Sequence, residues 1–245
     1  MFVEKEFYIG FADIMSMCDK VSNKAILTYL EDIAGIHSNI IGCGLNDVPE
    51  SKHTWIILGW KVHIYNRPIY GETIKIKTWS KPMKNCCALR DFEIFNKDSE
   101  LIGIATSKWV YLEKGQIAKI PKEVADLYKS EPDYHTFTEK EIEKLSEPEE
   151  ITCMKNIQIT RSMIDINNHV HNVYYLDIAD EAIPDDIYNT NEFNKFQIMY
   201  KTGIKRLPNE NYVNCAYTNL EKNHVVVIKD QNRSTLHAIV NYELD

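Results

Sequence analysis

The chain has 245 residues, of which 44% are hydrophobic and 26% are charged, a composition typical of a folded globular protein. Its formal net charge of -8 at pH 7 argues against a nucleic-acid-binding protein, because contacts with phosphates need a concentrated basic surface. No apolar run approaches the ~18 residues of a membrane span, and the opening MFVEKEFYIG lacks the layout of a signal peptide, so we expect a cytoplasmic protein.

The first half of the sequence predicts one helix followed by strands. Ser22 or Asn23 can cap the helix, because their side chains accept backbone N–H groups that the first turn leaves free. Apolar residues then recur at helical spacing as far as Gly42 and Gly44, where the helix should end. Stretches rich in β-branched and aromatic residues, separated by turn residues, predict strands at 55–65, 72–79, 88–96 and 100–113.

A connector is expected between the halves. Pro121 favours the first turn of a short helix over 121–129. The following segment, 130–150, is strongly acidic and contains two prolines, which is typical of a solvated linker. We therefore predict an N-terminal domain at 1–120, a connecting helix and linker at 121–152, and a C-terminal domain at 153–245.

The second half repeats the order of the first, with a helix near 170–182 and strands near 195–204, 211–219, 224–230 and 234–243. Short matches join the halves: Ser16-Met17-Cys18-Asp19 with Ser162-Met163-Ile164-Asp165, and Pro68 with Pro208. Their common order indicates duplication. One helix followed by an antiparallel sheet, twice over, is an α+β layout. A long helix across a curved sheet is the hotdog arrangement, so we expect a tandem hotdog fold.

Polar residues gather in Asp165-Ile166-Asn167-Asn168-His169, where the second helix is expected to begin. The free N–H groups of a helix N-terminus can hold the oxyanion that forms in acyl transfer. His169 and Asp165 supply a titratable pair for moving a proton or orienting water. Asn167 can donate and accept hydrogen bonds without a net charge. The same pattern also fits an ordinary Asn-rich loop with a helix cap.

The duplication makes this cluster asymmetric. In the predicted alignment Asp19 faces Asp165, but Val21 faces Asn167 and Asn23 faces His169. Only the second half therefore carries the polar set. We expect the second half to supply the chemistry and the first half to hold the substrate.

Residues 165–175, DINNHVHNVYY, resemble the D-x-N-x-H-V-N-N-x-x-Y motif of the acyl-ACP thioesterase family of plants and bacteria. Residues 66–72, NRPIYGE, followed by Thr78-Trp79, resemble the R-P-x-x-G-E…T-W hairpin of that family. The resemblance implies a tandem hotdog fold. It implies hydrolysis of fatty acyl-ACP to free fatty acid and ACP in fatty acid biosynthesis, with no metal and no organic cofactor.

The resemblance also implies a catalytic set of Asp165, Asn167 and His169. Asn167 would hydrogen-bond the thioester, His169 would activate water or assist the leaving sulfur, and Asp165 would fix both groups. Parts of the first helix and of strands 55–60 and 74–79 are expected to wall a pocket for the acyl chain.

Two positions depart from the family pattern. His171 replaces an asparagine that is common there, and we interpret it as a bystander. Gly203-Ile204 stands where the family has a glutamate proposed to activate water, followed in plant members by a cysteine. We interpret Cys215 as a strand residue, since nothing in the sequence indicates a lowered pKa for its thiol. Water attack without a covalent intermediate is therefore the expected mechanism.

His169-x-His171 has the spacing of two metal ligands on a strand, but the helix expected here and the lack of further ligands nearby lead us to expect no metal. The expected partner is acyl carrier protein bearing a phosphopantetheine-linked acyl chain. The chain would be a monomer or a homodimer. Candidate docking residues for the acidic carrier share a positive charge: Lys61, Arg67, Lys201, Lys205 and Arg206.

Three other functions fit the sequence. An acyl-CoA thioesterase or another hotdog enzyme, such as a hydroxyacyl dehydratase, would share the fold. A catalytically weakened acyl-ACP binding protein is suggested by Gly203.

Overall fold

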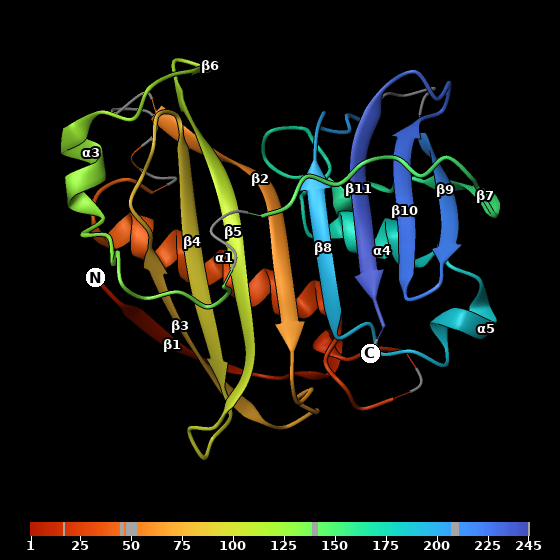
Figure 1. The fold of residues 1–245 in the computed structure, drawn as a ribbon, viewed down its shortest axis with the longest axis horizontal. Coiled ribbons are helices and arrows are strands. Elements are labelled where there is room, and N and C mark those ends of the chain that lie inside the picture. Colours follow the sequence, from red (N-terminus) through yellow and green to blue (C-terminus); the bar gives the residue numbers. More distant parts are fainter. Residues whose placement is uncertain (17, 45–46, 48–52, 139–141, 207–210, 245) are drawn as a thin grey trace. The chain divides into compact units, whose positions relative to one another are not determined.

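Two units repeat one topology along the chain, Met1–Ile142 and Glu143–Asp245 (Figure 1). The computed structural model describes all residues except 17, 45–46, 48–52, 139–141, 207–210 and 245. Among the described residues, no helix has both the length and the apolar character needed to cross a membrane.

The sheet of unit 1 has the strand order β1-β3-β4-β5-β2, with all neighbours antiparallel and β6 paired to β5. Its strands are β1 (Val3–Tyr8), β2 (His53–Ile64), β3 (Thr73–Ser80), β4 (Cys87–Phe95), β5 (Leu101–Glu113) and β6 (Gln116–Ile117). A short 3₁₀ helix, η1 (Phe11–Asp13), precedes the long helix α1 (Asn23–Ile40).

Helix α1 packs against the sheet of unit 1 in the hotdog arrangement. Ser22 caps it, because the Ser22 hydroxyl accepts the Ala25 N–H at 3.1 Å. Ile26, Leu30 and Ile33 recur on one face and are 0% exposed, so this face forms the core against the strands.

Unit 2 has the strand order β8-β11-β10-β9-β7, again antiparallel throughout. Its elements are β7 (Cys153–Gln158), η3 (Arg161–Met163), α4 (Tyr174–Asp180), α5 (Asp185–Tyr188), β8 (Lys195–Tyr200), β9 (Tyr212–Leu220), β10 (Asn223–Asp230) and β11 (Leu236–Glu243). Taken in chain order, β7 to β11 occupy the places that β1 to β5 hold in unit 1. The shared strand order supports the duplication, and the predicted tandem hotdog fold is confirmed.

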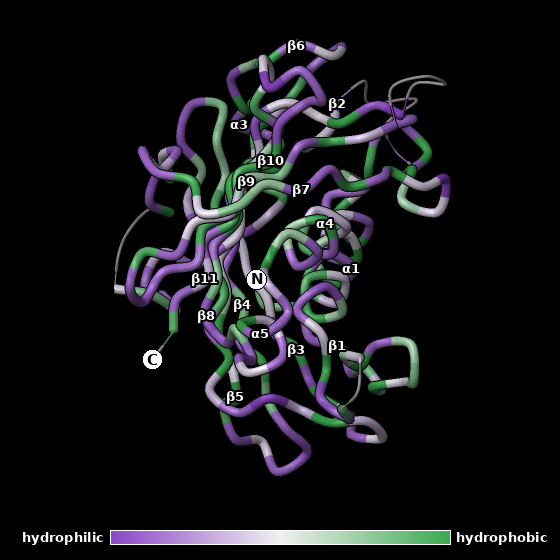
Figure 2. The backbone as a smooth tube through the Cα atoms, turned by 90° about the vertical axis from the view of Figure 1, so that its right-hand side faces the viewer, coloured by the Kyte–Doolittle hydropathy of each residue, from purple (hydrophilic) through white to green (hydrophobic). Residues whose placement is uncertain are grey.

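Most predicted elements are present, with two kinds of error. Strands β1 and β7 were missed because each lies at a sheet edge and exposes most of its side chains, so neither shows a buried alternation. In contrast, the middle of β10 is a hydrophobic run that Figure 2 shows in green. The second helix begins at Tyr174 rather than near 170, and β8 ends at Tyr200 rather than near 204.

The acidic connector is attached to unit 1 over its first part. Helix α3 (Lys122–Leu127) follows Pro121, as predicted. Glu131 donates its N–H to the Ser80 carbonyl at 2.9 Å, and Thr136 donates its N–H to the Asp91 carboxylate at 3.2 Å. Residues 131–136 are therefore bound along the sheet rather than free in solvent. The three-part division at 120 and 152 stays a prediction.

A partly buried carboxyl group is desolvated at the end of α4 in unit 2. Asp180 ends α4, and its carboxylate accepts a hydrogen bond from the hydroxyl of Tyr242, a residue that is 0% exposed. Burial raises the pKa of the Asp180 carboxyl to about 7, against the opposing effect of the Tyr242 hydrogen bond.

This pKa predicts a pH-dependent stability. Between about pH 4 and pH 7 the unfolded chain releases the Asp180 proton before the folded chain does, so the free energy of unfolding falls as the pH rises. Asp180→Asn keeps an acceptor for Tyr242 without the charge. The melting temperature of Asp180→Asn minus that of the wild type should increase as the pH is raised from 4.5 to 7.5. For Asp185→Asn, at an exposed carboxylate, this difference should stay constant. A constant difference for Asp180→Asn across this range would contradict the prediction.

Candidate active site

The predicted catalytic residues lie in a hairpin turn that precedes the helix. Ile164 and Val170 form an antiparallel bridge, and the Asp165 N–H donates to the His169 carbonyl at 2.8 Å. Asn168 reverses the chain with a φ of +60°, a left-handed conformation that asparagine tolerates. The predicted helix start within the motif is therefore wrong. The idea that helix N–H groups hold an oxyanion loses its basis with it.

Asp165 shapes this turn through its side chain. Its Oδ1 accepts the backbone N–H of Asn167 at 2.8 Å and that of His169 at 3.1 Å. An aspartate that binds N–H groups of its own turn fixes the backbone there. Asp165 thus positions both predicted catalytic partners, and the structure brings all three residues into one turn.

The imidazole of His169 has a defined orientation. Its Nδ1 lies 2.9 Å from the carbonyl oxygen of Asn167. A carbonyl only accepts, so Nδ1 carries the hydrogen, and in the neutral ring Nε2 then holds the free lone pair. The Asn167 side chain is exposed at the tip of the turn and His169 is partly exposed. The arrangement offers a base, Nε2, and an amide that can donate a hydrogen bond to a carbonyl oxygen.

Gly203 provides the space for the His169 ring. A Cβ at position 203 would lie 2.8 Å from His169 Cδ2, closer than carbon atoms pack. The ring therefore lies directly against the backbone of Gly203. The residue that departs from the family pattern and the motif histidine are in contact.

Ile204 ties the segment after β8 to the motif turn. The Val170 N–H donates to the Ile204 carbonyl at 2.8 Å, and the Ile204 N–H donates to the Tyr175 hydroxyl at 3.0 Å. Burial raises the pKa of Tyr175 to about 12, although the Ile204 hydrogen bond opposes this. Tyr175 therefore stays neutral and serves as a fixed acceptor.

Unit 1 has a counterpart of this turn, in a different register from the predicted one. Ile14 and Val21 form the equivalent bridge, and the Met15 N–H donates to the Lys20 carbonyl at 2.8 Å. Met15, and not Asp19, therefore corresponds to Asp165. The predicted pairing is wrong because the short match of residues 16–19 with 162–165 is four residues out of the structural register, in which η1 and η3 already correspond before the turn. The turn 15–20 is also one residue longer than 165–169. The matched residues Met17 and Pro208 lie outside the described part of the chain.

The corrected register changes which residue of unit 2 corresponds to Arg67. The Val21 N–H donates to the Pro68 carbonyl at 3.0 Å, as Val170 does to Ile204, so Arg67 corresponds to Gly203. Arg67 is 7% exposed, and its guanidinium donates to the Val21 carbonyl at 2.8 Å and to Asn23 Oδ1 at 2.9 Å. Its predicted place in a docking surface is wrong, because its charge is buried.

The other predicted docking residues stay a prediction. Lys201 and Lys205 are exposed and Arg206 is partly exposed. Lys61 lies over the ring of Phe137, with 4.9 Å between Nζ and the ring centroid.

Cys215 and His171 lie outside the turn. Cys215 is 0% exposed in β9, and burial raises the pKa of its thiol to about 12, so its interpretation as a strand residue is confirmed. The His171 ring meets Tyr174 edge-on, with centroids 6.4 Å apart. No group of three or more His, Cys, Asp or Glu able to hold a metal is present in the described parts of the chain.

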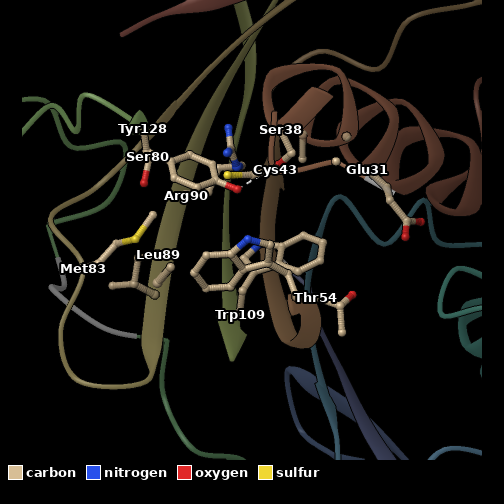
Figure 3. Close-up of a pocket in the computed structure, with 15 residues that line it drawn as sticks. Glu31, Ser38, Cys43, Thr54, Ser80, Met83, Leu89, Arg90, Trp109 and Tyr128 are labelled. Carbon is tan, nitrogen blue, oxygen red and sulfur yellow. Dashed lines mark hydrogen bonds between the residues drawn. The ribbon is translucent and has the colours of Figure 1, made fainter. Parts of the chain in front are cut away.

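Unit 1 contains a cavity of about 210 Å³ (Figure 3). As predicted, α1 and the first half of β2 contribute to its wall, with Ala34, Ser38 and Trp55 among the lining residues. The predicted stretch 74–79 does not line it, and Ser80 at the end of β3 does. Sequence analysis missed Arg90 as a cavity residue, although an arginine within a predicted strand was a possible signal.

Comparison with known proteins gives matches along both units. The family profile of the acyl-ACP thioesterase N-terminal domain matches residues 2–128, and that of the C-terminal domain matches residues 146–242. A chloroplastic oleoyl-acyl carrier protein thioesterase of Coriandrum sativum is 27% identical over 197 residues, which cover 73% of this chain and 53% of the relative. A dodecanoyl-[acyl-carrier-protein] hydrolase of Cinnamomum camphora is 26% identical over 190 residues, 72% of this chain and 50% of the relative. The chain thus spans about half the length of the curated relatives it matches.

Solved structures share the whole fold. An acyl-ACP thioesterase from Bacteroides thetaiotaomicron superposes with a TM-score of 0.85 at 18% identity, covering 100% of this chain and 98% of the other. A 12:0-ACP thioesterase from Umbellularia californica gives 0.82 at 18% identity, with 99% and 96% covered. At this identity the likeness establishes the fold.

The contact of Gly203 with His169 can be tested by spectroscopy. We expect Gly203→Ala to displace the imidazole, because the new methyl group would overlap Cδ2. The proton–carbon correlation of the His169 ring should shift, while those of the histidines in unit 1 stay. Thr202→Ala, a change at the neighbouring exposed residue whose carbonyl is bound by His237, should leave the His169 signal in place. An unmoved His169 signal in Gly203→Ala would show that the ring lies elsewhere.

Proposed function

The chain belongs to the acyl-ACP thioesterase family, and from this premise we propose that it hydrolyses fatty acyl-ACP to the free fatty acid and the thiol of the carrier. The observation that carries the proposal is the turn 165–169. It orients the Nε2 lone pair of His169 through the hydrogen bond between Nδ1 and the Asn167 carbonyl. A base with a defined tautomer beside an exposed amide suits acyl transfer to water.

In the proposed reaction, Nε2 of His169 takes a proton from a water molecule as the water oxygen bonds to the thioester carbon. The carbonyl oxygen gains the electron pair of the broken π bond. The side-chain N–H of Asn167 donates to this oxyanion. Collapse restores the C=O bond and breaks the C–S bond.

The sulfur leaves with the bonding electrons and receives the proton from Nε2 of His169, so the base is regenerated. A thiol of this kind has a pKa of about 8.5, which makes sulfur a better leaving group than an alkoxide. Asp165 acts as a positioning residue, because its carboxylate holds the N–H groups of Asn167 and His169.

The cavity of unit 1 is proposed to hold the acyl chain, and unit 2 to carry the reacting groups. A role in fatty acid biosynthesis and the acyl carrier protein as partner belong to the same proposal. The cytoplasmic location and the monomeric or dimeric state stay predictions.

His169→Ala and Asn167→Ala should each lower hydrolysis by about 10²-fold or more, the scale of lost acid–base or oxyanion help. The measurement is thiol release from saturated acyl-ACP of several chain lengths. His171→Ala, a histidine two residues away, should keep the wild-type rate. Near-wild-type rates in both His169→Ala and Asn167→Ala would contradict the proposed catalytic role of the turn 165–169.

The same assay separates the alternatives. Equal rates with acyl-CoA and acyl-ACP would favour an acyl-CoA thioesterase. A hydroxyacyl dehydratase would release no thiol, and an acyl-ACP binding protein would bind acyl-ACP without turnover.

A further inference from the structure

Arg90 places a buried guanidinium at the cavity of unit 1. The residue lies in β4, is 6% exposed and lines the cavity. Its Nη1 donates to Nδ1 of His37 at 2.8 Å and to the Thr78 hydroxyl at 3.3 Å. Figure 3 shows Arg90 with Tyr128 and Ser38 in the upper part of the view, and Trp109 and Leu89 below them.

Among the residues that the structure describes, the neighbours of Arg90 leave its charge without an ionic partner. Burial, followed by the positive charge of Arg90, lowers the pKa of His37 to about 3, so His37 is a neutral acceptor. Burial lowers the pKa of Arg90 only to about 10, so the guanidinium stays protonated at neutral pH. Within the described residues no carboxylate pairs with Arg90. The adjacent Asp91 lies on the opposite face of β4 and pairs with Lys81, with 3.3 Å between Nζ and Oδ2.

A buried charge without an ionic partner is costly, and a ligand can supply that partner. Two hydroxyl groups accompany the guanidinium, those of Ser38 and Tyr128, which lie 3.1 Å apart and also line the cavity. A guanidinium with nearby hydroxyl donors suits a carboxylate. The indole rings of Trp55 and Trp109 supply an apolar wall for a hydrocarbon chain.

The cavity is partly open to solvent, so its volume indicates the length of chain that it covers. An apolar cavity of about 150 Å³ holds benzene, with its six carbons. At the same space per carbon, the cavity of about 210 Å³ has room for about eight carbons.

We propose that this cavity binds the carboxylate end of an aliphatic chain of about eight carbons, with Arg90 pairing the carboxylate. The carboxylate has two possible sources. It is either the far end of a dicarboxylic acyl group on the carrier, which rests on the proposed hydrolysis, or the head group of a free fatty acid. Both present the same chemistry to Arg90.

Calorimetric titration of the purified chain with octanoate and with 1-octanol tests the site. Octanoate should bind at least about tenfold more tightly than 1-octanol, since a charge-assisted hydrogen bond exceeds a neutral one by this amount. Arg90→Met should remove this preference. Lys84→Met removes the same charge from an exposed position between β3 and β4 and should keep it.

Equal binding of the two ligands by the wild-type chain, or no binding of octanoate, would overturn the proposal. The comparison needs no variant, so it stands even if Arg90→Met does not fold. Binding does not depend on turnover, so an inactive chain that prefers octanoate contradicts only the proposed hydrolysis.

Hydrolysis rates distinguish the two sources of the carboxylate, the dicarboxylic acyl group and the free fatty acid. Faster hydrolysis of octanedioyl-ACP than of octanoyl-ACP, lost in Arg90→Met, indicates the substrate end. Equal rates, with octanoate as a competitive inhibitor, indicate the free fatty acid.

Discussion

The Asp165 carboxylate accepts the N–H groups of Asn167 and His169, and the polar groups of the candidate active site depend on this interaction. It fixes a five-residue turn whose two ends are joined by the Ile164–Val170 bridge. The fixed turn orients the Asn167 carbonyl, which accepts a hydrogen bond from Nδ1 of the His169 ring. A carboxylate that shapes a backbone turn can therefore set the tautomer of a histidine without touching its ring.

The two units of the duplicated fold carry different residues at one equivalent backbone position. Both units have the same strand order and a bridged turn before the helix. At one equivalent position, unit 1 has Arg67, whose guanidinium donates to the Val21 carbonyl at the end of the turn. Unit 2 has Gly203 there, which leaves space for the imidazole of His169. The same backbone position thus holds a buried guanidinium in unit 1 and leaves space for the His169 ring in unit 2.

Sequence analysis recovered what short-range patterns determine. Helical spacing located α1, and alternation with turn residues located the central strands. The motif was found because its residues are close in sequence. The register of the repeat, the start of α4 and the contact of Gly203 with His169 depend on turn length and tertiary hydrogen bonds, such as that from Val170 to Ile204. No local pattern encodes those. Arg90 was not identified as a cavity residue for the same reason, since the absence of an acidic partner among the described residues is visible only once the strands and α1 are packed.

Our central claim is that Gly203 belongs to a working arrangement of His169 and does not mark a lost catalytic group. The most direct measurement is the rate of thiol release from acyl-ACP by Gly203→Glu, which restores the glutamate of the family pattern, with Thr202→Glu as the charge-matched control. The account predicts slower hydrolysis in Gly203→Glu alone, because its Cβ would lie 2.8 Å from His169 Cδ2 and displace the ring. Hydrolysis as fast as or faster than that of the wild type would contradict it.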